Sequence, residues 1–127
     1  MDNIEEKSWG YYAVLEEGTS YKIKRVYIAP NQKLSLQMHY HRSEHWIVIK
    51  GMALVTIGDK EFFLRSGEST FVQCGVQHRI ENPGVIPLEV IEVEIGQYIN
   101  EDDIVRIDDP FEMKQYVACP EEDIRNV

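Results

Sequence analysis

The sequence predicts an all-β fold in which short antiparallel strands form a barrel or a sandwich. Segments in which polar and apolar residues alternate recur along most of the chain, and this period of two is typical of strands with one buried face. Glycine, proline, asparagine and aspartate separate the segments at short intervals. The length of 127 residues fits a single domain. A barrel has the further advantage that closure removes exposed sheet edges.

The expected strands follow one another along the chain. They cover residues 21–28, 33–40, 45–50, 53–57, 61–64, 69–72, 77–81 and 88–95. The pair Gly58-Asp59 is typical of a hairpin turn between two of them. Beyond the last strand, acidic clusters at 101–103, 108–109 and 121–123 indicate a solvated and irregular surface segment.

Charge and composition exclude several classes of function. The formal net charge is -9, which argues against nucleic-acid binding because phosphate contacts need a basic surface. Residues 1–7 are acidic and polar and have no features of a secretion signal. No apolar run approaches the length of a membrane span. We therefore expect a cytoplasmic protein that contacts neither nucleic acid nor membrane.

The segment from His39 to His45 is the most informative part of the chain. In a strand, alternate side chains point to one face, so His39 and His41 are expected to project together. Glu44 follows after a short bend, and all four histidines of the chain lie in this segment or in the motif around His78. Ligands of this kind suit Zn, Mn, Fe, Co or Ni. The sequence predicts one divalent metal ion, with zinc the first expectation, bound by His39, His41, Glu44 and His78.

These motifs resemble those of the cupin superfamily. The first cupin motif has a His-x-His pair, then a Glu, then six residues and a Gly, and here six residues separate Glu44 from Gly51. The second motif is matched over residues 67–82, which include His78. The gap between His41 and Glu44 is one residue shorter than usual, which leaves His45 as a rival third ligand. Glu44 is favoured because burial fixes strand register, whereas loops change length easily.

A longer stretch is similar to the type II mannose-6-phosphate isomerase domain. The resemblance is most specific in Gln37-Met38-His39-Tyr40-His41-Arg42-Ser43-Glu44-His45-Trp46, and it covers about residues 7–112 of a single domain 1–127, with a tail at 113–127. It implies a double-stranded β-helix, the jelly-roll barrel of cupins. In many relatives this domain follows a nucleotidyltransferase that makes GDP-mannose. We expect this chain to be the stand-alone isomerase domain, in the same polysaccharide and nucleotide-sugar pathway.

The resemblance implies interconversion of mannose 6-phosphate and fructose 6-phosphate through an enediol. A metal is needed to polarise the carbonyl, a base to move the proton, and cations to hold the phosphate. Glu92 and His45 are the expected bases, and Arg42 is expected at the catalytic centre. The expected substrate-binding residues are Arg42, Lys24, Lys22 and Arg79 for the phosphate, Gln37 to orient a ligand or hydroxyl, and Trp46 to pack over the sugar ring.

Two further interpretations compete with the isomerase. One is a non-catalytic cupin that binds a sugar phosphate or sugar nucleotide. The other is a different cupin enzyme, such as an iron-dependent dioxygenase. A homodimer is the expected assembly, because soluble homo-oligomers are most often two-fold symmetric.

Overall fold

A computed structural model describes residues 3–107, and every regular element in this range is a strand. The strands, in chain order, are β1 (Asn3–Lys7), β2 (Gly10–Glu17), β3 (Tyr21–Ile28), β4 (Gln37–Met38), β5 (Arg42–Lys50), β6 (Met52–Ile57), β7 (Lys60–Arg65), β8 (Ser69–Val72), β9 (His78–Glu81), β10 (Leu88–Gly96) and β11 (Val105–Arg106). The prediction of an all-β fold is confirmed. Within the described range, no helix is long and apolar enough to span a membrane.

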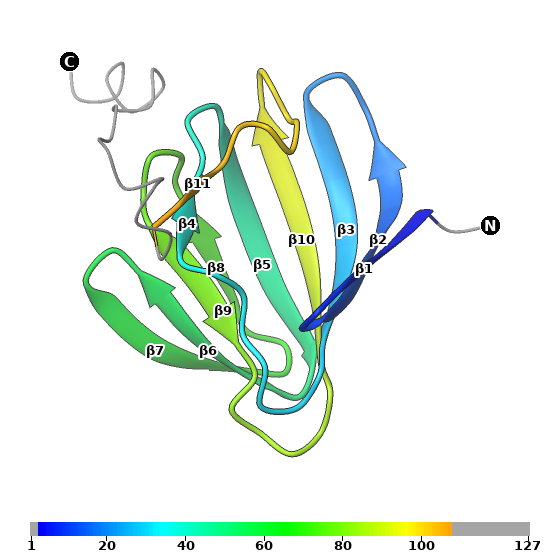
Figure 1. Cartoon of the computed structure of the whole chain (residues 1–127), viewed down its shortest axis with the longest axis vertical. Coiled ribbons are helices and arrows are strands. Elements are labelled where there is room, and N and C mark those ends of the chain that lie inside the picture. The colour runs from blue at the N-terminus through cyan, green and yellow to red at the C-terminus, as the bar shows by residue number, and fades with distance from the viewer. Residues whose placement is uncertain (1–2, 108–127) are drawn as a thin grey trace.

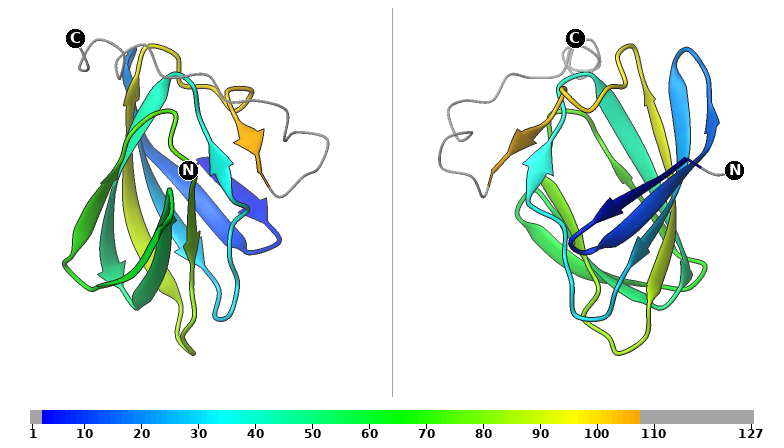
Figure 2. Two further views of the ribbon diagram at one scale, coloured as in Figure 1. Left: turned by 90° about the vertical axis from the view of Figure 1, so that its left-hand side faces the viewer. Right: turned by 45° about the vertical axis from the view of Figure 1, so that its right-hand side comes forward.

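The strands form two antiparallel sheets that enclose a common interior (Figures 1 and 2). The larger sheet has the order β1-β2-β3-β10-β5-β8, and the smaller has the order β11-β4-β9-β6-β7. Neighbours such as β3, β10 and β5 are far apart in the chain, so the sheets are not simple meanders. The connection from β10 to β11 crosses in front of β5 in Figure 1.

The strand predictions hold for most of the chain. The hairpin around Gly58-Asp59 is present as β6 and β7. The expected strand over 33–40 is wrong, because only Gln37–Met38 has ladder pairing, while Lys33 makes a single isolated bridge to Glu81. The paired strands β1 and β2 and the short strand β11 were not predicted. The acidic clusters at 108–109 and 121–123 and the tail at 113–127 lie outside the described residues.

The interior of the barrel is apolar at one end and polar at the other. In β3, β5 and β10, the even-numbered residues face inward, as the alternation of a strand requires. The apolar end contains buried pairs from each strand, namely Val26 and Ile28, Trp46 and Val48, and Leu88 and Val90. At the other end the same inward rows continue with Lys24, Arg42, Glu44 and Glu94. Charged groups buried in this way point to a functional site.

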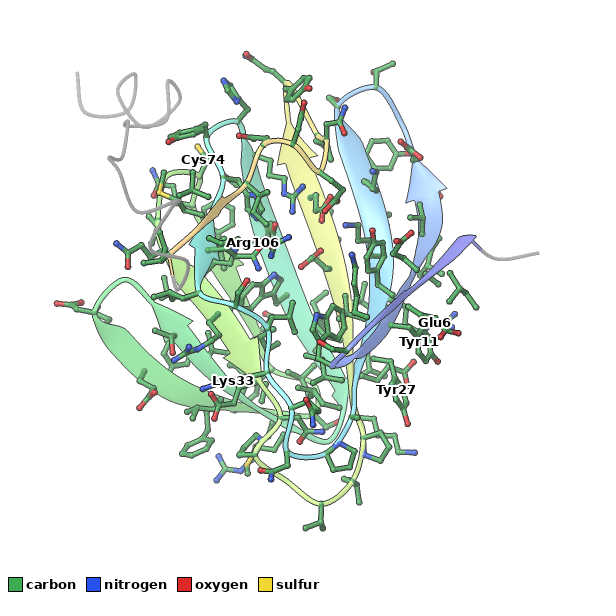
Figure 3. All side chains as sticks on the ribbon, viewed as in Figure 1. Glu6, Tyr11, Tyr27, Lys33, Cys74 and Arg106 are labelled. Atoms are coloured by element: carbon green, nitrogen blue, oxygen red, sulfur yellow. The ribbon has the colours of Figure 1, made fainter. Side chains whose placement is uncertain are left out.

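One glycine permits the turn from β5 to β6. Gly51 has φ +88°, a backbone conformation that favours glycine. A Cβ at this position would also lie 2.7 Å from the carbonyl oxygen of Pro87. On the outer face of the larger sheet, Tyr11 and Tyr27 stack with ring centroids 4.8 Å apart (Figure 3). This stack lies away from the polar interior. Tyr27 has an odd-numbered position in β3, whose even-numbered residues face inward, and Tyr11 of β2 is its partner across the strand pair.

Candidate metal centre

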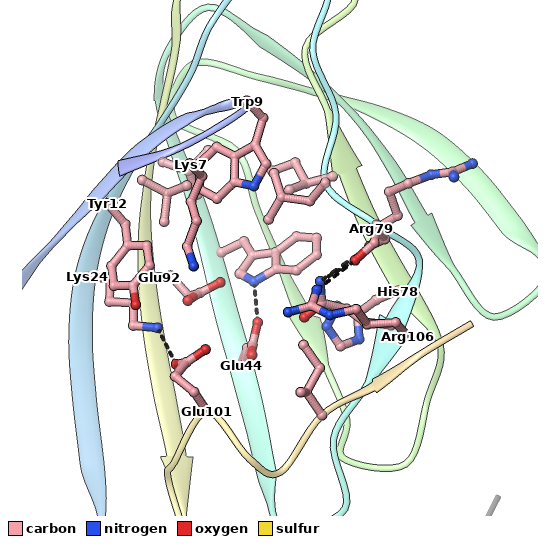
Figure 4. A pocket seen from close by; sticks show the side chains of 18 of the residues that line it. Lys7, Trp9, Tyr12, Lys24, Glu44, His78, Arg79, Glu92, Glu101 and Arg106 are labelled. Carbon is pink, nitrogen blue, oxygen red and sulfur yellow. Dashed lines mark hydrogen bonds and ion pairs between the residues drawn. The ribbon is translucent and has the colours of Figure 1, made fainter. Parts of the chain in front are cut away.

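Three buried side chains converge at the polar end of the barrel. His39 follows β4, Glu44 lies on β5 and His78 begins β9. One nitrogen or oxygen atom of each lies within 4.8 Å of the corresponding atoms of the other two. Glu44 and His78 line a cavity of about 120 Å³ that extends to the protein surface (Figure 4). The structure thus brings together three of the four residues predicted as metal ligands.

Backbone contacts fix the orientation of both histidine rings. The Nδ1 atom of His39 lies 2.7 Å from the carbonyl oxygen of Asp103, and that of His78 lies 3.0 Å from the carbonyl oxygen of Val76. A carbonyl oxygen only accepts, so each Nδ1 carries the proton and each Nε2 presents a lone pair. Burial lowers the pKa of His39 to about 4 and also lowers the pKa of His78. Both rings are therefore neutral near pH 7, the form that binds a metal.

Glu44 is held as a carboxylate beside these rings. Burial alone would raise its pKa, but His39 and Arg42 more than offset that effect and hold the pKa well below the usual range. The indole N–H of Trp46 donates to Oε1 of Glu44 at 2.8 Å, and Nε of Arg42 donates to Oε2 at 2.9 Å. Both contacts favour the charged form of the carboxylate.

The donor set fits a divalent ion. Two neutral imidazole nitrogens and one carboxylate oxygen suit zinc and the neighbouring transition metals. The Nη2 atom of Arg42 lies 3.1 Å from Nε2 of His39, and Nε of the same guanidinium contacts Glu44. The guanidinium of Arg42 thus already contacts the donor atoms of His39 and Glu44, and an ion bound by these atoms would displace it from them.

His41 is not part of this cluster. Its side chain is 47% exposed, against 2% for His39, and its Nδ1 lies 3.4 Å from Oδ1 of Asp103. The prediction that the two histidines project together is wrong, because the chain bends at Tyr40 and His41 and does not continue as a strand. Alternation of side chains applies only within a strand.

Gln37 takes the place that the prediction gave to a second histidine. It precedes His39 by two residues and pairs with His78 across β4 and β9. Its amide Nε2 contacts the carbonyl and hydroxyl oxygens of Ser35 at 3.3 and 3.2 Å, and its side chain lines the cavity. Since its donor is occupied by Ser35, the carbonyl oxygen is the group that Gln37 offers to a ligand. If Gln37 and His39 stand at the two positions of the His-x-His pair, four residues separate the second position from Glu44. The gap before the glutamate is then not shortened.

His45 lies on the wrong face for catalysis. It occupies an odd-numbered position of β5, is exposed, and packs its ring against Phe71 with centroids 4.6 Å apart. This position does not support His45 as base or rival ligand. The register argument that selected Glu44 agrees with the structure.

Glu92 does face the interior. It lines the cavity. In the sheet, Glu92 pairs with Lys24 on β3 and with Trp46 on β5, the two strands that flank β10. Burial raises the pKa of Glu92 well above the usual range, and the carboxylates of Glu44 and Glu94 beside it raise the pKa further. A carboxyl group with a raised pKa next to a set of candidate metal ligands is a suitable proton carrier.

The cations expected to bind phosphate are mostly committed elsewhere. Arg42 is buried and pairs with Glu44 at 2.9 Å and with Glu94 at 3.4 Å. Lys24 pairs with Glu94 at 3.1 Å and with Glu101 at 3.2 Å. Lys22 lies 3.8 Å from Glu17. These positions do not support a role in phosphate binding.

Arg79 and Trp46 complete the comparison with the predicted residues. Arg79 has an odd-numbered position in β9, next to the inward His78. It lines the cavity, but the end of its side chain points away from the pocket in Figure 4. Trp46 lines the cavity, but it is also part of the apolar core and is bonded to Glu44. Trp46 therefore supports the site from the side of the apolar core.

Asp103 is a site residue that the sequence reasoning missed. It lies in the acidic cluster 101–103, which was expected to be solvated, yet it is only 5% exposed. Its carboxylate accepts the backbone N–H groups of Tyr40 at 3.0 Å and His41 at 2.9 Å, while its own carbonyl accepts from His39. Asp103 thus stabilises the bend that turns His39 inward. Asp-Asp pairs after a strand carry no signal that separates such a residue from a surface one.

The fold and the cluster together define the chain as a cupin. A solved structure of a similar fold is an RmlC-like cupin from Shewanella frigidimarina NCIMB 400, with a TM-score of 0.71 and 20% identity over 80% of this chain and 88% of that one. The predicted double-stranded β-helix is confirmed by this similarity.

The chain belongs to the family described as mannose-6-phosphate isomerase C-terminal, which matches residues 3–109. It is 49% identical over 105 residues to the xanthan biosynthesis protein XanB of Xanthomonas campestris pv. campestris (strain B100), which covers 83% of this chain and 22% of that protein. It is 47% identical over 100 residues to mannose-1-phosphate guanylyltransferase 2 of Escherichia coli O157:H7, which covers 79% and 21%. The chain thus spans about a fifth of the length of these relatives.

Proposed function

We propose that this cupin domain binds one divalent metal ion and interconverts mannose 6-phosphate and fructose 6-phosphate. The observation that carries the proposal is that a candidate metal-ligand set and a possible proton carrier lie side by side at one cavity. A set of neutral imidazoles and a carboxylate, in His39, His78 and Glu44, lies beside Glu92, a carboxyl of raised pKa. The family to which the chain belongs supports the choice of substrate.

The chemistry requires a proton to move between two adjacent carbons of the sugar. A divalent ion held by His39, Glu44 and His78 would supply Lewis-acid polarisation of the substrate carbonyl. Glu92 takes the proton from one carbon and returns it to the other, because a carboxyl with a raised pKa exchanges a proton more readily at neutral pH than an ordinary one.

Two other residues hold these groups in place. Arg42 neutralises Glu44 and Glu94 from inside the barrel, and Trp46 directs one oxygen of Glu44 by its indole N–H. Gln37 lines the cavity and bonds Ser35 through its amide nitrogen, so its amide oxygen is suited to orient a hydroxyl or complete the ligand set.

The test is isomerisation and proton exchange by the metal-loaded chain. Mannose 6-phosphate is incubated with the protein in heavy water, and nuclear magnetic resonance follows both fructose 6-phosphate formation and loss of the C2 proton signal. We expect both, with chelation abolishing them and metal restoring them. Glu92→Gln should lower turnover by about a hundredfold or more while metal content is kept, and His45→Gln, the matched control on the outer face, should turn over normally.

A binding domain is the competing function, since the chain spans only about a fifth of its relatives. In that case, the metal-loaded protein would bind the sugar phosphate in calorimetry and show no exchange of the C2 proton. That result would replace the isomerase by a metal-containing binding domain.

A further inference from the structure

Leaving aside Arg79, the cations that line the cavity form two groups. The deep group is Lys24 and Arg42, whose side chains are 5% exposed and paired with buried Glu94. The outer group includes Lys7, the last residue of β1, and Arg106, the last residue of β11. Both of these are exposed and line the same cavity. The two groups differ in their partners, and this difference decides which of them is available to an anionic ligand.

Lys7 and Arg106 have no acidic partner within residues 3–107. The ion pairs of this range occupy Lys22, Lys24, Arg25 and Arg42, and none involves either outer cation. Figure 4 shows the two side chains entering the pocket from opposite sides. No ion pair within the described part of the chain therefore cancels their charges where a ligand would enter.

Arg106 is also held in position. Its Nη1 donates to the hydroxyl of Ser35 at 3.1 Å, and the same hydroxyl accepts from Gln37 at 3.2 Å. This contact uses one of the five N–H donors of the guanidinium, so the others can form the two parallel bonds that a phosphate accepts best. Lys7, in contrast, would contribute a flexible point charge.

The cavity thus has a polarity along its length. Its buried part carries His78, Glu44 and the inward-facing Glu92. Its exposed part carries Lys7 and Arg106, which have no acidic partner among residues 3–107, and Glu101, which pairs with Lys24. A hexose 6-phosphate has the same polarity, because the reacting carbons and the phosphate are at opposite ends of the molecule. The match favours a single orientation of such a ligand, with its carbonyl end innermost.

We propose that Lys7 and Arg106 form the phosphate subsite of this cavity and select phosphorylated over neutral sugars. The inference rests on the proposed function for the identity of the sugar. It replaces the deep cations as phosphate ligands, because moving Arg42 or Lys24 to a phosphate would take from the buried Glu94 one of its two cationic partners.

Calorimetry on the metal-loaded chain tests the subsite without any need for turnover. The titrants are mannose 6-phosphate, mannose and inorganic phosphate. Arg106→Gln should weaken mannose 6-phosphate binding by about tenfold to a hundredfold, the loss expected for a charge-assisted bond, and Lys7→Gln by less. Binding of mannose and of the metal should not change. Lys60→Gln, an exposed cation on β7 outside the cavity, is the matched control and should bind like the unaltered chain.

Three results would overturn the subsite. The first is a Lys7→Gln, Arg106→Gln double variant that binds mannose 6-phosphate as tightly as the unaltered chain. The second is a double variant that loses affinity for mannose and mannose 6-phosphate equally. The third is an unaltered chain that shows no preference for the phosphorylated sugar. Failure of the isomerase proposal is a separate outcome: binding and its loss in the variants would be as expected here, but the C2 proton would not exchange.

Discussion

Asp103 is predicted to control metal affinity although it does not touch the metal. Replacing it by alanine removes the acceptor of two backbone N–H groups, at 3.0 Å from Tyr40 and 2.9 Å from His41. These bonds hold the bend that places His39, and the Asp103 carbonyl at 2.7 Å orients the ring. Once the carboxylate is lost, the segment carrying that carbonyl is no longer tied to the bend, and His39 loses its fixed orientation.

The size of the effect follows from these contacts. A hydrogen bond to a charged group contributes about 1.5–3 kcal/mol when it is well buried. His41 is exposed, so water replaces part of that loss on its side of the bend. For Asp103→Ala we expect a tenfold to hundredfold weaker metal affinity, about 1.4–2.8 kcal/mol, as is typical when a supporting partner of a histidine ligand is removed.

Calorimetric titration with zinc, together with the visible absorption of the cobalt-loaded protein, measures this prediction. Asp102→Ala is the matched control, because Asp102 is exposed and its carboxylate oxygens lie 2.8 and 2.9 Å from the hydroxyl of Tyr98. The control should retain both the affinity and the cobalt spectrum. Unchanged zinc affinity in Asp103→Ala, with an unchanged spectrum, would refute the idea that this bend positions His39.

Two further predictions concern the support of Glu44. Arg42→Gln leaves Glu44 and Glu94 with fewer cations, so thermal unfolding of the metal-free protein should show a loss of about 3–5 kcal/mol; a saturating metal should recover part of it by binding only the folded state, and equal stability without metal would contradict this. Trp46→Phe removes the N–H donor at 2.8 Å from Glu44 while keeping an aromatic ring, so calorimetry should show severalfold weaker zinc binding, and an unchanged affinity would count against this role.

Local patterns predicted the parts of the site that lie within strands. Alternation places Glu92 on the inner face of β10, and the register from Gly51 selects Glu44 on β5. Both predictions succeed because burial of one sheet face fixes which parity points inward. His78 also begins a strand, so its position facing the interior could be predicted in the same way.

Irregular backbone and long-range contacts account for the failures. The side chains were expected to alternate from His39 to His41 as in a strand, but the chain bends at Tyr40 and His41. The bend depends on Asp103, which is more than sixty residues away. Lys7 and Arg106 meet at one cavity only because β1 and β11 lie at the ends of different sheets. Nothing in the local sequence of either residue separates it from an ordinary surface cation.

The most direct test of the metal centre is the metal content of histidine variants after reconstitution and removal of loosely bound ions. Elemental analysis should find about one divalent ion per chain in the unaltered protein and also in His41→Ala, because His41 lies outside the cluster. His39→Ala and His78→Ala should each lose most of the ion while keeping a folded barrel by circular dichroism. Absence of an ion from the unaltered protein, or its loss from His41→Ala, would contradict the ligand set of His39, Glu44 and His78.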